Sequence, residues 1–132
     1  MRRDFELREA DRLALASLGL PWETIRDQGS LWLVIHDMPI PIGYTVATVS
    51  VALQIPANYP ASHIDMAYFH PPIVRRDGKQ IPASDSTQVI DGKTYQRWSR
   101  HYTAENPWRP EEDDVGTHLE LVQLWLRCEL MR

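Results

Sequence analysis

Cysteine is nearly absent from the 132-residue sequence, which contains only Cys128. One thiol cannot form an intramolecular disulfide, and it cannot build a thiolate metal cage by itself, so this composition is typical of a reducing compartment. Basic residues are also few, since 14 Lys and Arg stand against 18 Asp and Glu for a net charge of -4. An acidic chain lacks the positive surface that a phosphate backbone requires, and no nucleic-acid partner is expected.

Long apolar runs are missing as well. The first 12 residues carry many charges, which excludes the apolar segment of a signal peptide. No later run approaches the roughly 20 apolar residues that cross a bilayer. We therefore expect a cytoplasmic protein without membrane contact. The apolar fraction of 43% is enough for one hydrophobic core at this length, and we predict a single domain over residues 1–132.

Hydrophobic periodicity predicts a helix near each end of the chain. Asp4 suits the N-cap of a first helix over residues 5–18, which Gly19 would end. Its apolar face is expected to hold Leu7, Ala10, Ala14 and Leu18. A second helix is predicted after the acidic segment 110–114, with an apolar face made of Val115, Leu119, Val122 and Leu126.

Four strands are predicted between these helices. Residues 22–26 and 31–36 are β-rich runs on either side of a short turn. Residues 44–55 alternate, and their apolar face is expected to pack on a helix through Ala47, Val49, Val51, Leu53 and Ile55. Residues 64–69 form the fourth run, and residues 74–96 contain turn chemistry typical of a long loop. The predicted fold class is α+β, with an N-terminal helix, a four-stranded antiparallel meander, a long loop and a C-terminal helix.

Three short motifs follow the predicted third and fourth strands. They are Tyr59-Pro60, then Phe69-His70-Pro71-Pro72, then Trp98-Ser99. In this order they resemble the sequence motifs of the ubiquitin-conjugating-enzyme (UBC) superfamily. The segment 59–66, together with Trp98-Ser99-Arg100-His101 and Trp108-Arg109-Pro110, is most similar to the prokaryotic ubiquitin-conjugating-like family E. The resemblance covers nearly the whole chain and implies a UBC-like fold.

Two departures from active UBC enzymes concern the catalytic positions. The resemblance places Pro72 at the asparagine that supports the oxyanion, and proline has no side-chain amide to donate. Counted through the glycine turn that follows, the nucleophilic cysteine position falls at Gln80 or Ile81, and neither side chain can form a thioester. The hydroxyls nearby would form only a less reactive ester, and they belong to Ser84 and Ser86. The resemblance therefore implies a variant that binds rather than transfers, with no catalytic residue and no cofactor.

The single thiol and the histidines raise enzymatic alternatives. Cys128 could carry a thioester, but the C-terminal end of a helix disfavours a thiolate anion, so we interpret it as a core or semi-exposed residue. The five histidines lack tight ligand spacing, and no metal site is expected. His101 and His118 could serve acid–base chemistry, but we interpret both as structural. Trp98 and Trp108 flank predicted loops and are expected to be partly exposed.

The resemblance supports one leading hypothesis and two alternatives. The leading hypothesis is a non-catalytic protein of a bacterial ubiquitin-like modification pathway, which binds the modifier or its activating enzyme. Relatives typically accompany a ubiquitin-like protein, a ThiF-type activating enzyme and a JAB-type metallopeptidase, so these are the implied partners. The alternatives are an active transferase with an atypical nucleophile and a generic interaction module of the related RWD-like fold.

Overall fold

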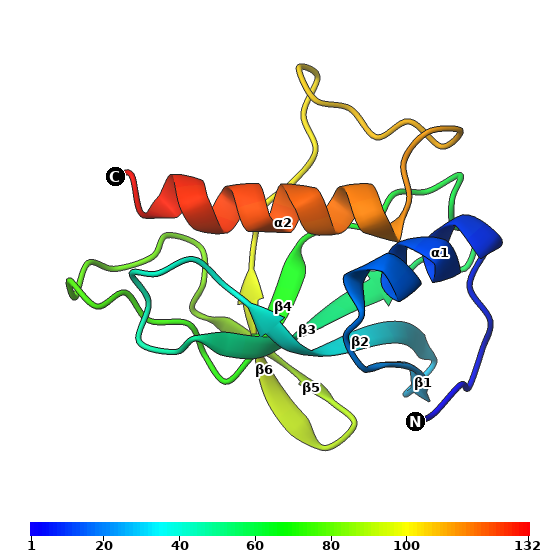
Figure 1. The fold of residues 1–132 in the computed structure, drawn as a ribbon, viewed down its shortest axis with the longest axis horizontal. Coiled ribbons are helices and arrows are strands. Elements are labelled where there is room, and N and C mark those ends of the chain that lie inside the picture. Colours follow the sequence, from blue (N-terminus) through cyan, green and yellow to red (C-terminus); the bar gives the residue numbers. More distant parts are fainter.

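The computed structural model describes residues 1–132 and contains two helices and one six-stranded antiparallel sheet (Figure 1). The helices are α1 (Glu9–Leu18) and α2 (Val115–Glu129). The strands are β1 (Trp22–Asp27), β2 (Ser30–Pro39), β3 (Thr48–Ile55), β4 (Ala67–His70), β5 (Ser86–Ile90) and β6 (Lys93–Trp98), in the spatial order β1-β2-β3-β4-β6-β5. The predicted α+β class is confirmed.

The prediction of four strands is wrong, because residues 86–98 form a hairpin where a loop was expected. β5 and β6 are largely polar, so an apolar alternation does not mark them in the sequence. Asp91 and Gly92 join them, and their φ angles of 50° and 78° are the positive values that a two-residue type I′ turn requires. Ile90 pairs with Lys93 across this turn. The Asp-Gly pair is therefore a hairpin signal within the predicted loop.

The first helix begins at Glu9 rather than at residue 5, because the preceding segment lies along the edge of β1. The Thr24 N–H donates to the Arg2 carbonyl at 3.1 Å, and the Asp4 N–H donates to the Thr24 carbonyl at 2.9 Å. The Asp4 carboxylate accepts from the Arg26 N–H at 3.0 Å and so does not cap the helix. The segment thereby pairs backbone groups that an exposed strand edge would leave free.

The buried face of α1 also differs from the prediction. Its buried residues are Asp11 and Leu15, whereas Leu18 is 39% exposed and Leu7 is buried ahead of the helix. Leu7 lies outside the helix because the helix starts later, and Ala10 is exposed because the buried face is centred on Asp11 and Leu15. A charged residue on the buried face was not expected from the apolar pattern.

β3 and β4 both begin later than predicted. β3 begins at Thr48 rather than at residue 44, because residues 44–47 interact with the loop after β4, where the Thr45 N–H donates to the Val74 carbonyl at 2.9 Å. β4 begins at Ala67 rather than at residue 64. Met66 precedes it with a φ of 58°, which lies outside the extended region.

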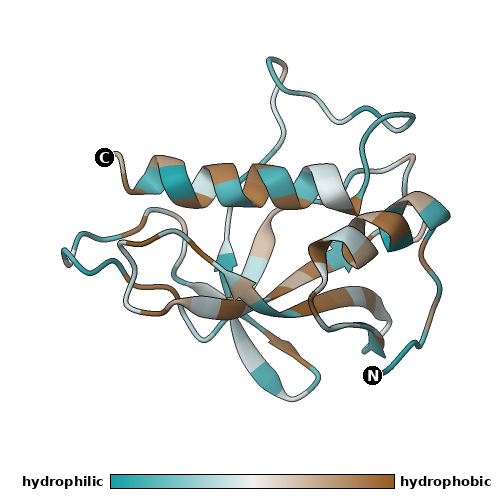
Figure 2. Cartoon of the chain, viewed as in Figure 1, coloured by the Kyte–Doolittle hydropathy of each residue, from teal (hydrophilic) through white to brown (hydrophobic).

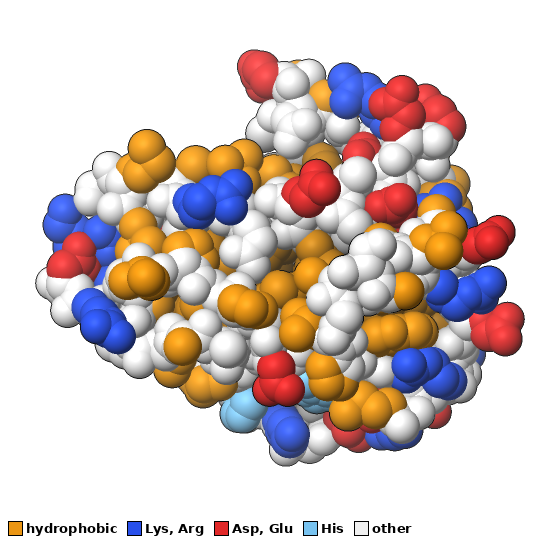
Figure 3. Space-filling view, in the orientation of Figure 1, with side chains coloured by type: hydrophobic (Ala, Val, Ile, Leu, Met, Phe, Trp, Pro, Cys, Tyr) orange, Lys and Arg blue, Asp and Glu red, His pale blue; other side chains and the backbone are white.

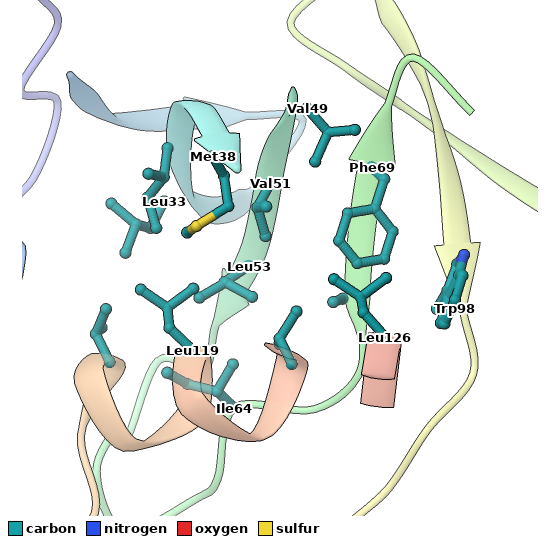
Figure 4. Close-up of a cluster of buried hydrophobic side chains, with 14 of the residues drawn as sticks. Leu33, Met38, Val49, Val51, Leu53, Ile64, Phe69, Trp98, Leu119 and Leu126 are labelled. Carbon is teal, nitrogen blue, oxygen red and sulfur yellow. The ribbon is translucent and has the colours of Figure 1, made fainter. Parts of the chain in front are cut away.

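The odd-numbered face of β3 packs against α2 as predicted, except that Ala47 precedes the strand and is exposed. Val49, Val51 and Leu53 are at most 2% exposed and share the main core with α2 (Figure 4). The apolar face predicted for α2 is also correct, since its core residues are Val115, Leu119, Val122 and Leu126. Apolar positions recur along α2 and on the strands beneath it (Figure 2). This packing fixes α2 across the sheet.

A smaller core lies on the opposite face of the sheet. It contains Ala52 from β3 with six other buried side chains, which are Ile25, Trp32, Val34, Tyr68, Ile90 and Tyr95. The β5–β6 hairpin supplies two of them and reaches back to β1, where the Asp91 N–H donates to the Asp27 carboxylate at 3.0 Å. The sheet therefore curls, and the hairpin covers what would otherwise be its exposed apolar face.

The two helices approach closely where α2 begins. A Cβ added to Gly116 would lie 2.8 Å from the Ala14 Cβ, so only glycine fits without a shift. A groove of about 380 Å³ lies beside this contact and is lined by residues such as Leu18, Met38 and Leu119. Figure 3 shows apolar side chains gathered on this face of the molecule. Neither helix has the length and apolar character that would let it span a bilayer.

Candidate functional site

The Tyr59-Pro60 motif connects the two helices. The Tyr59 hydroxyl donates to the Asp11 carboxylate at 2.6 Å and accepts from the Arg8 guanidinium at 2.9 Å. Asp11 is fully buried, and the same carboxylate oxygen accepts from the Val115 N–H at the start of α2 at 3.0 Å. Burial, together with the hydrogen bond to Asp11, raises the pKa of Tyr59, which keeps the hydroxyl protonated. The motif tyrosine is therefore part of the framework.

The two tryptophans that were expected to be partly exposed differ in burial. Trp108 is partly buried, and its Nε1–H donates to the Pro60 carbonyl at 2.9 Å. Trp98 is 0% exposed, so that prediction is wrong for this residue. Because residues 93–98 form a strand rather than a loop, the Trp98 ring points into the core, 5.5 Å from the Phe69 ring.

The His70-Pro71-Pro72 motif ends β4 at the edge of the candidate site. His70 Nδ1 lies 3.0 Å from the Thr94 carbonyl on β6, and a carbonyl only accepts, so Nδ1 carries the proton. The histidine thereby ties the strand end to the hairpin. Pro72 is exposed and has no donor group on its side chain. This position offers nothing to stabilise an oxyanion.

Gln96 holds the chain just after the proline pair. Its Oε1 accepts from the Ile73 N–H at 2.8 Å, and its Nε2 donates to the Ile73 carbonyl at 3.2 Å. The Trp98 indole N–H also donates to Oε1, at 3.1 Å. These three bonds fix the amide orientation, and both ends of the amide are occupied. Gln96 consequently positions the loop that starts at Ile73.

A buried ion pair attaches this loop to the end of α2. Arg75 is 3% exposed and donates to the Glu129 carboxylate at 2.9 Å, and two further bonds join it to Asp77 at 3.0 and 2.7 Å. These carboxylates raise the pKa of Arg75. Burial opposes ionisation of Glu129, but hydrogen bonds from Arg132 and Arg75 outweigh it and lower the pKa of that carboxyl. Both partners are charged, and the pair links this loop to the end of α2.

The backbone at the position predicted for the nucleophile is hydrogen-bonded to Arg132. The Arg132 guanidinium donates to the Gln80 carbonyl at 2.8 Å, and Lys79 Nζ donates to the Arg132 carbonyl at 2.9 Å. The Gln80 side chain is exposed, whereas Ile81 is partly buried. Both residues line a cleft of about 220 Å³, whose wall also includes Ile73, Val74, Arg75, Ser84 and Gln96. The cleft therefore presents charged, amide, alkyl and hydroxyl groups but no thiol.

Cys128 lies nearer to this loop than its sequence position indicates. The cysteine is exposed, so its interpretation as a core or semi-exposed residue is wrong. It lines a hollow of about 430 Å³ together with Pro82, Arg100, Trp125, Glu129 and Arg132. The packing of α2 on the sheet thus brings the only thiol to the outer side of the loop that contains Gln80 and Ile81.

The two histidines singled out by the sequence have different environments. His118 is fully buried between the Met66 carbonyl, 2.9 Å from Nε2, and the Tyr102 hydroxyl, 2.8 Å from Nδ1. Burial lowers the pKa of His118 to about 4, so the ring is neutral and structural. His101 is exposed instead, with Nδ1 2.9 Å from the Asp65 carboxylate and Nε2 3.4 Å from the Ser99 hydroxyl.

Several residues that shape the site were missed in the sequence analysis. Gln96, Arg75 and Glu129 position the loop, but polar residues in a predicted loop or a helix end give no sign of long-range partners. There was a weak indication in the sequence that Asp65 belongs to the site, because it lies within the segment 59–66 that carries the family resemblance. Only the pairing of β4 with β6 shows that it neighbours His101.

A comparison against known protein families agrees with the order of the motifs in the sequence, since the model for prokaryotic E2 family E matches residues 7–129. The chain belongs to this family. E2 denotes the ubiquitin-conjugating component, so this member of family E is an E2-like protein. No curated protein and no solved structure gives a significant match.

Proposed function

We propose that this family E protein binds a ubiquitin-like modifier or the enzyme that activates it, without carrying the modifier as a thioester. The main support for this proposal is the cleft at the predicted nucleophile position, which is lined by Gln80 and Ile81 and contains no thiol. Neither side chain supplies the sulfur that a thioester requires. Pro72 supports the same conclusion, because it offers no donor for the oxyanion of isopeptide formation.

The contacts that hold the loop of residues 73–80 support a binding role. Gln96 on one side and the Arg75–Glu129 ion pair on the other hold residues 73–80 in one arrangement. A preorganised surface loses less conformational entropy when a partner docks. Two exposed apolar side chains, Ile42 at 96% and Val74 at 51%, lie on the adjoining segments, which are joined by the Arg76 N–H bond to the Gly43 carbonyl at 2.9 Å.

The proposed partner is a ubiquitin-like protein from the same cell, and its activating enzyme would be of the ThiF type. The setting of such a pathway would be the cytoplasm, and the chain would act as one domain. If genes for these proteins lie next to the gene for this chain, the proposal is favoured over a generic RWD-like interaction module.

The proposal is tested by measuring binding calorimetrically, with the modifier and the activating enzyme encoded beside this protein. We expect a saturable complex with at least one of them, and Val74→Asp should weaken it by introducing a charge beside the cleft. Val89→Asp is the matched control, because Val89 is 54% exposed but lies on the β5–β6 hairpin. Absence of binding to both proteins, or equal weakening by the two variants, would contradict the proposal.

A further inference from the structure

The polar residues of two motif segments converge on one side of the loop. Asp65 precedes β4, while Ser99 and His101 follow β6. Ala67 pairs with Trp98 across these two strands, which brings the preceding and following residues together. None of these three side chains lines the cleft at Gln80 and Ile81.

The three side chains form a continuous hydrogen-bonded chain. The Asp65 Oδ1 lies 2.9 Å from His101 Nδ1, and a carboxylate only accepts, so Nδ1 carries the hydrogen. In the neutral ring, Nε2 then has a free lone pair, and it faces the Ser99 Oγ at 3.4 Å. An acid that orients a histidine, which in turn accepts from a hydroxyl, is the arrangement that activates a serine nucleophile. The longer Ser99 contact agrees with catalytic hydrogen bonds that tighten when substrate binds.

The surroundings leave this chain accessible and hold the serine in place. The side chains of His101 and Asp65 are 55% and 37% exposed. The Ser99 N–H donates to the Ala83 carbonyl at 2.9 Å, which anchors Ser99 to the loop beside the cleft. Its hydroxyl also meets the Met66 sulfur at 3.6 Å, a weak acceptor. Met66, Asp65 and His63 line an adjoining hollow of about 240 Å³.

A second serine–histidine–acid chain in the same molecule provides an internal comparison. His36 lies 2.9 Å from the Ser50 hydroxyl and 2.8 Å from the Glu23 carboxylate. Here the hydroxyl meets Nδ1 and the acid meets Nε2, which reverses the order at His101. The histidine and glutamate are only 20% and 19% exposed, and all three residues lie within neighbouring strands. This second chain cross-links the sheet.

We propose that Ser99, His101 and Asp65 form a nucleophilic site that hydrolyses carboxylic esters or thioesters. Ser99 Oγ attacks the acyl carbon while its proton passes to His101 Nε2, and Asp65 holds the Nδ1–H. The bond to the leaving alcohol or thiol then breaks, and that group takes the proton from Nε2. Water attacks the resulting Ser99 ester, gives a proton to His101 and releases the carboxylic acid. The proton on His101 returns to Ser99 Oγ, so each turnover consumes one ester and one water.

A fluorophosphonate probe tests the nucleophile directly. Attack by Ser99 forms an Oγ–P bond and expels fluoride, so we expect one labelled peptide, and it should contain Ser99. Ser99→Ala should abolish the label. Ser50→Ala is the matched control from the Ser50–His36–Glu23 cluster and should retain it. Labelling should also persist in a chelator, because no group of three His, Cys, Asp or Glu is arranged to hold a metal ion. An unlabelled wild-type chain, or a label elsewhere, would overturn the proposal.

Hydrolysis of p-nitrophenyl acetate and of an acyl thioester provides the second readout. Ser99→Ala and His101→Gln should lower kcat by about 100-fold or more, and Asp65→Asn should lower kcat with little change in KM. Every comparison is repeated in the Cys128→Ser chain, which removes ester cleavage by the thiol. Thermal unfolding of each variant checks that it folds. Equal rates for wild type and Ser99→Ala would overturn the proposal. Neither readout uses the modifier or its activating enzyme, so this inference and the proposed function can fail separately.

Discussion

The Tyr59 hydroxyl donates to the buried Asp11 carboxylate at 2.6 Å, which joins the Tyr-Pro turn to α1. Removing this hydroxyl leaves a buried carboxylate with one donor fewer. We expect Tyr59→Phe to lower the free energy of unfolding by about 1–3 kcal/mol, measured by urea denaturation. In the Asp11→Ala background, which lacks the acceptor, Tyr59→Phe should have a much smaller effect, and a double-mutant cycle measures the difference. Additive effects of the two changes would show that the bond contributes no coupling.

A charge introduced on the packed face of β3 should be severely destabilising. Val51 is 0% exposed and belongs to the main core with Leu119 and Leu126 of α2. An aspartate there would be buried without a partner, so Val51→Asp should cost about 3–5 kcal/mol of unfolding free energy. Thr48→Asp, at an exposed position of the same strand, is the control. An unchanged melting temperature for Val51→Asp would contradict the packing of this face.

Stability should decrease in mild acid because of His118. Its pKa is lowered from 6.5 in the unfolded chain to about 4 in the folded protein, mainly by burial. Between these values the unfolded chain binds a proton that the native protein does not, so stability is complete above pH 6.5 and falls towards pH 4. The loss should reach about 3 kcal/mol.

Denaturation curves at several pH values measure this dependence. His118→Gln keeps an N–H for the Met66 carbonyl but removes the titration, so its slope between pH 6.5 and 4 should be smaller than that of the wild type. Identical slopes for wild type and His118→Gln would contradict the prediction.

Incubation with activating enzyme, ATP and modifier should give no adduct that a thiol reductant removes. The cleft at Gln80 and Ile81 has no thiol, and the exposed Cys128 lies outside it, near the end of α2. Gel electrophoresis with and without reductant measures the outcome. A reductant-sensitive band in the wild type that disappears in Cys128→Ser would identify Cys128 as the carrier and establish an active transferase.

The sequence alone determined the fold class, the apolar face of α2 and most of the apolar face of β3. These features depend on local periodicity and on motif order, which the chain expresses directly. The β5–β6 hairpin was not predicted from its polar residues, because its apolar positions are few and the Asp-Gly signal was assigned to a loop. Tertiary structure decided which distant groups meet, since pairing β4 with β6 places Asp65 beside His101, and packing α2 on the sheet brings Glu129 to Arg75 and Cys128 to the loop. Such contacts depend on strand order and helix placement, and no spacing within the chain encodes them.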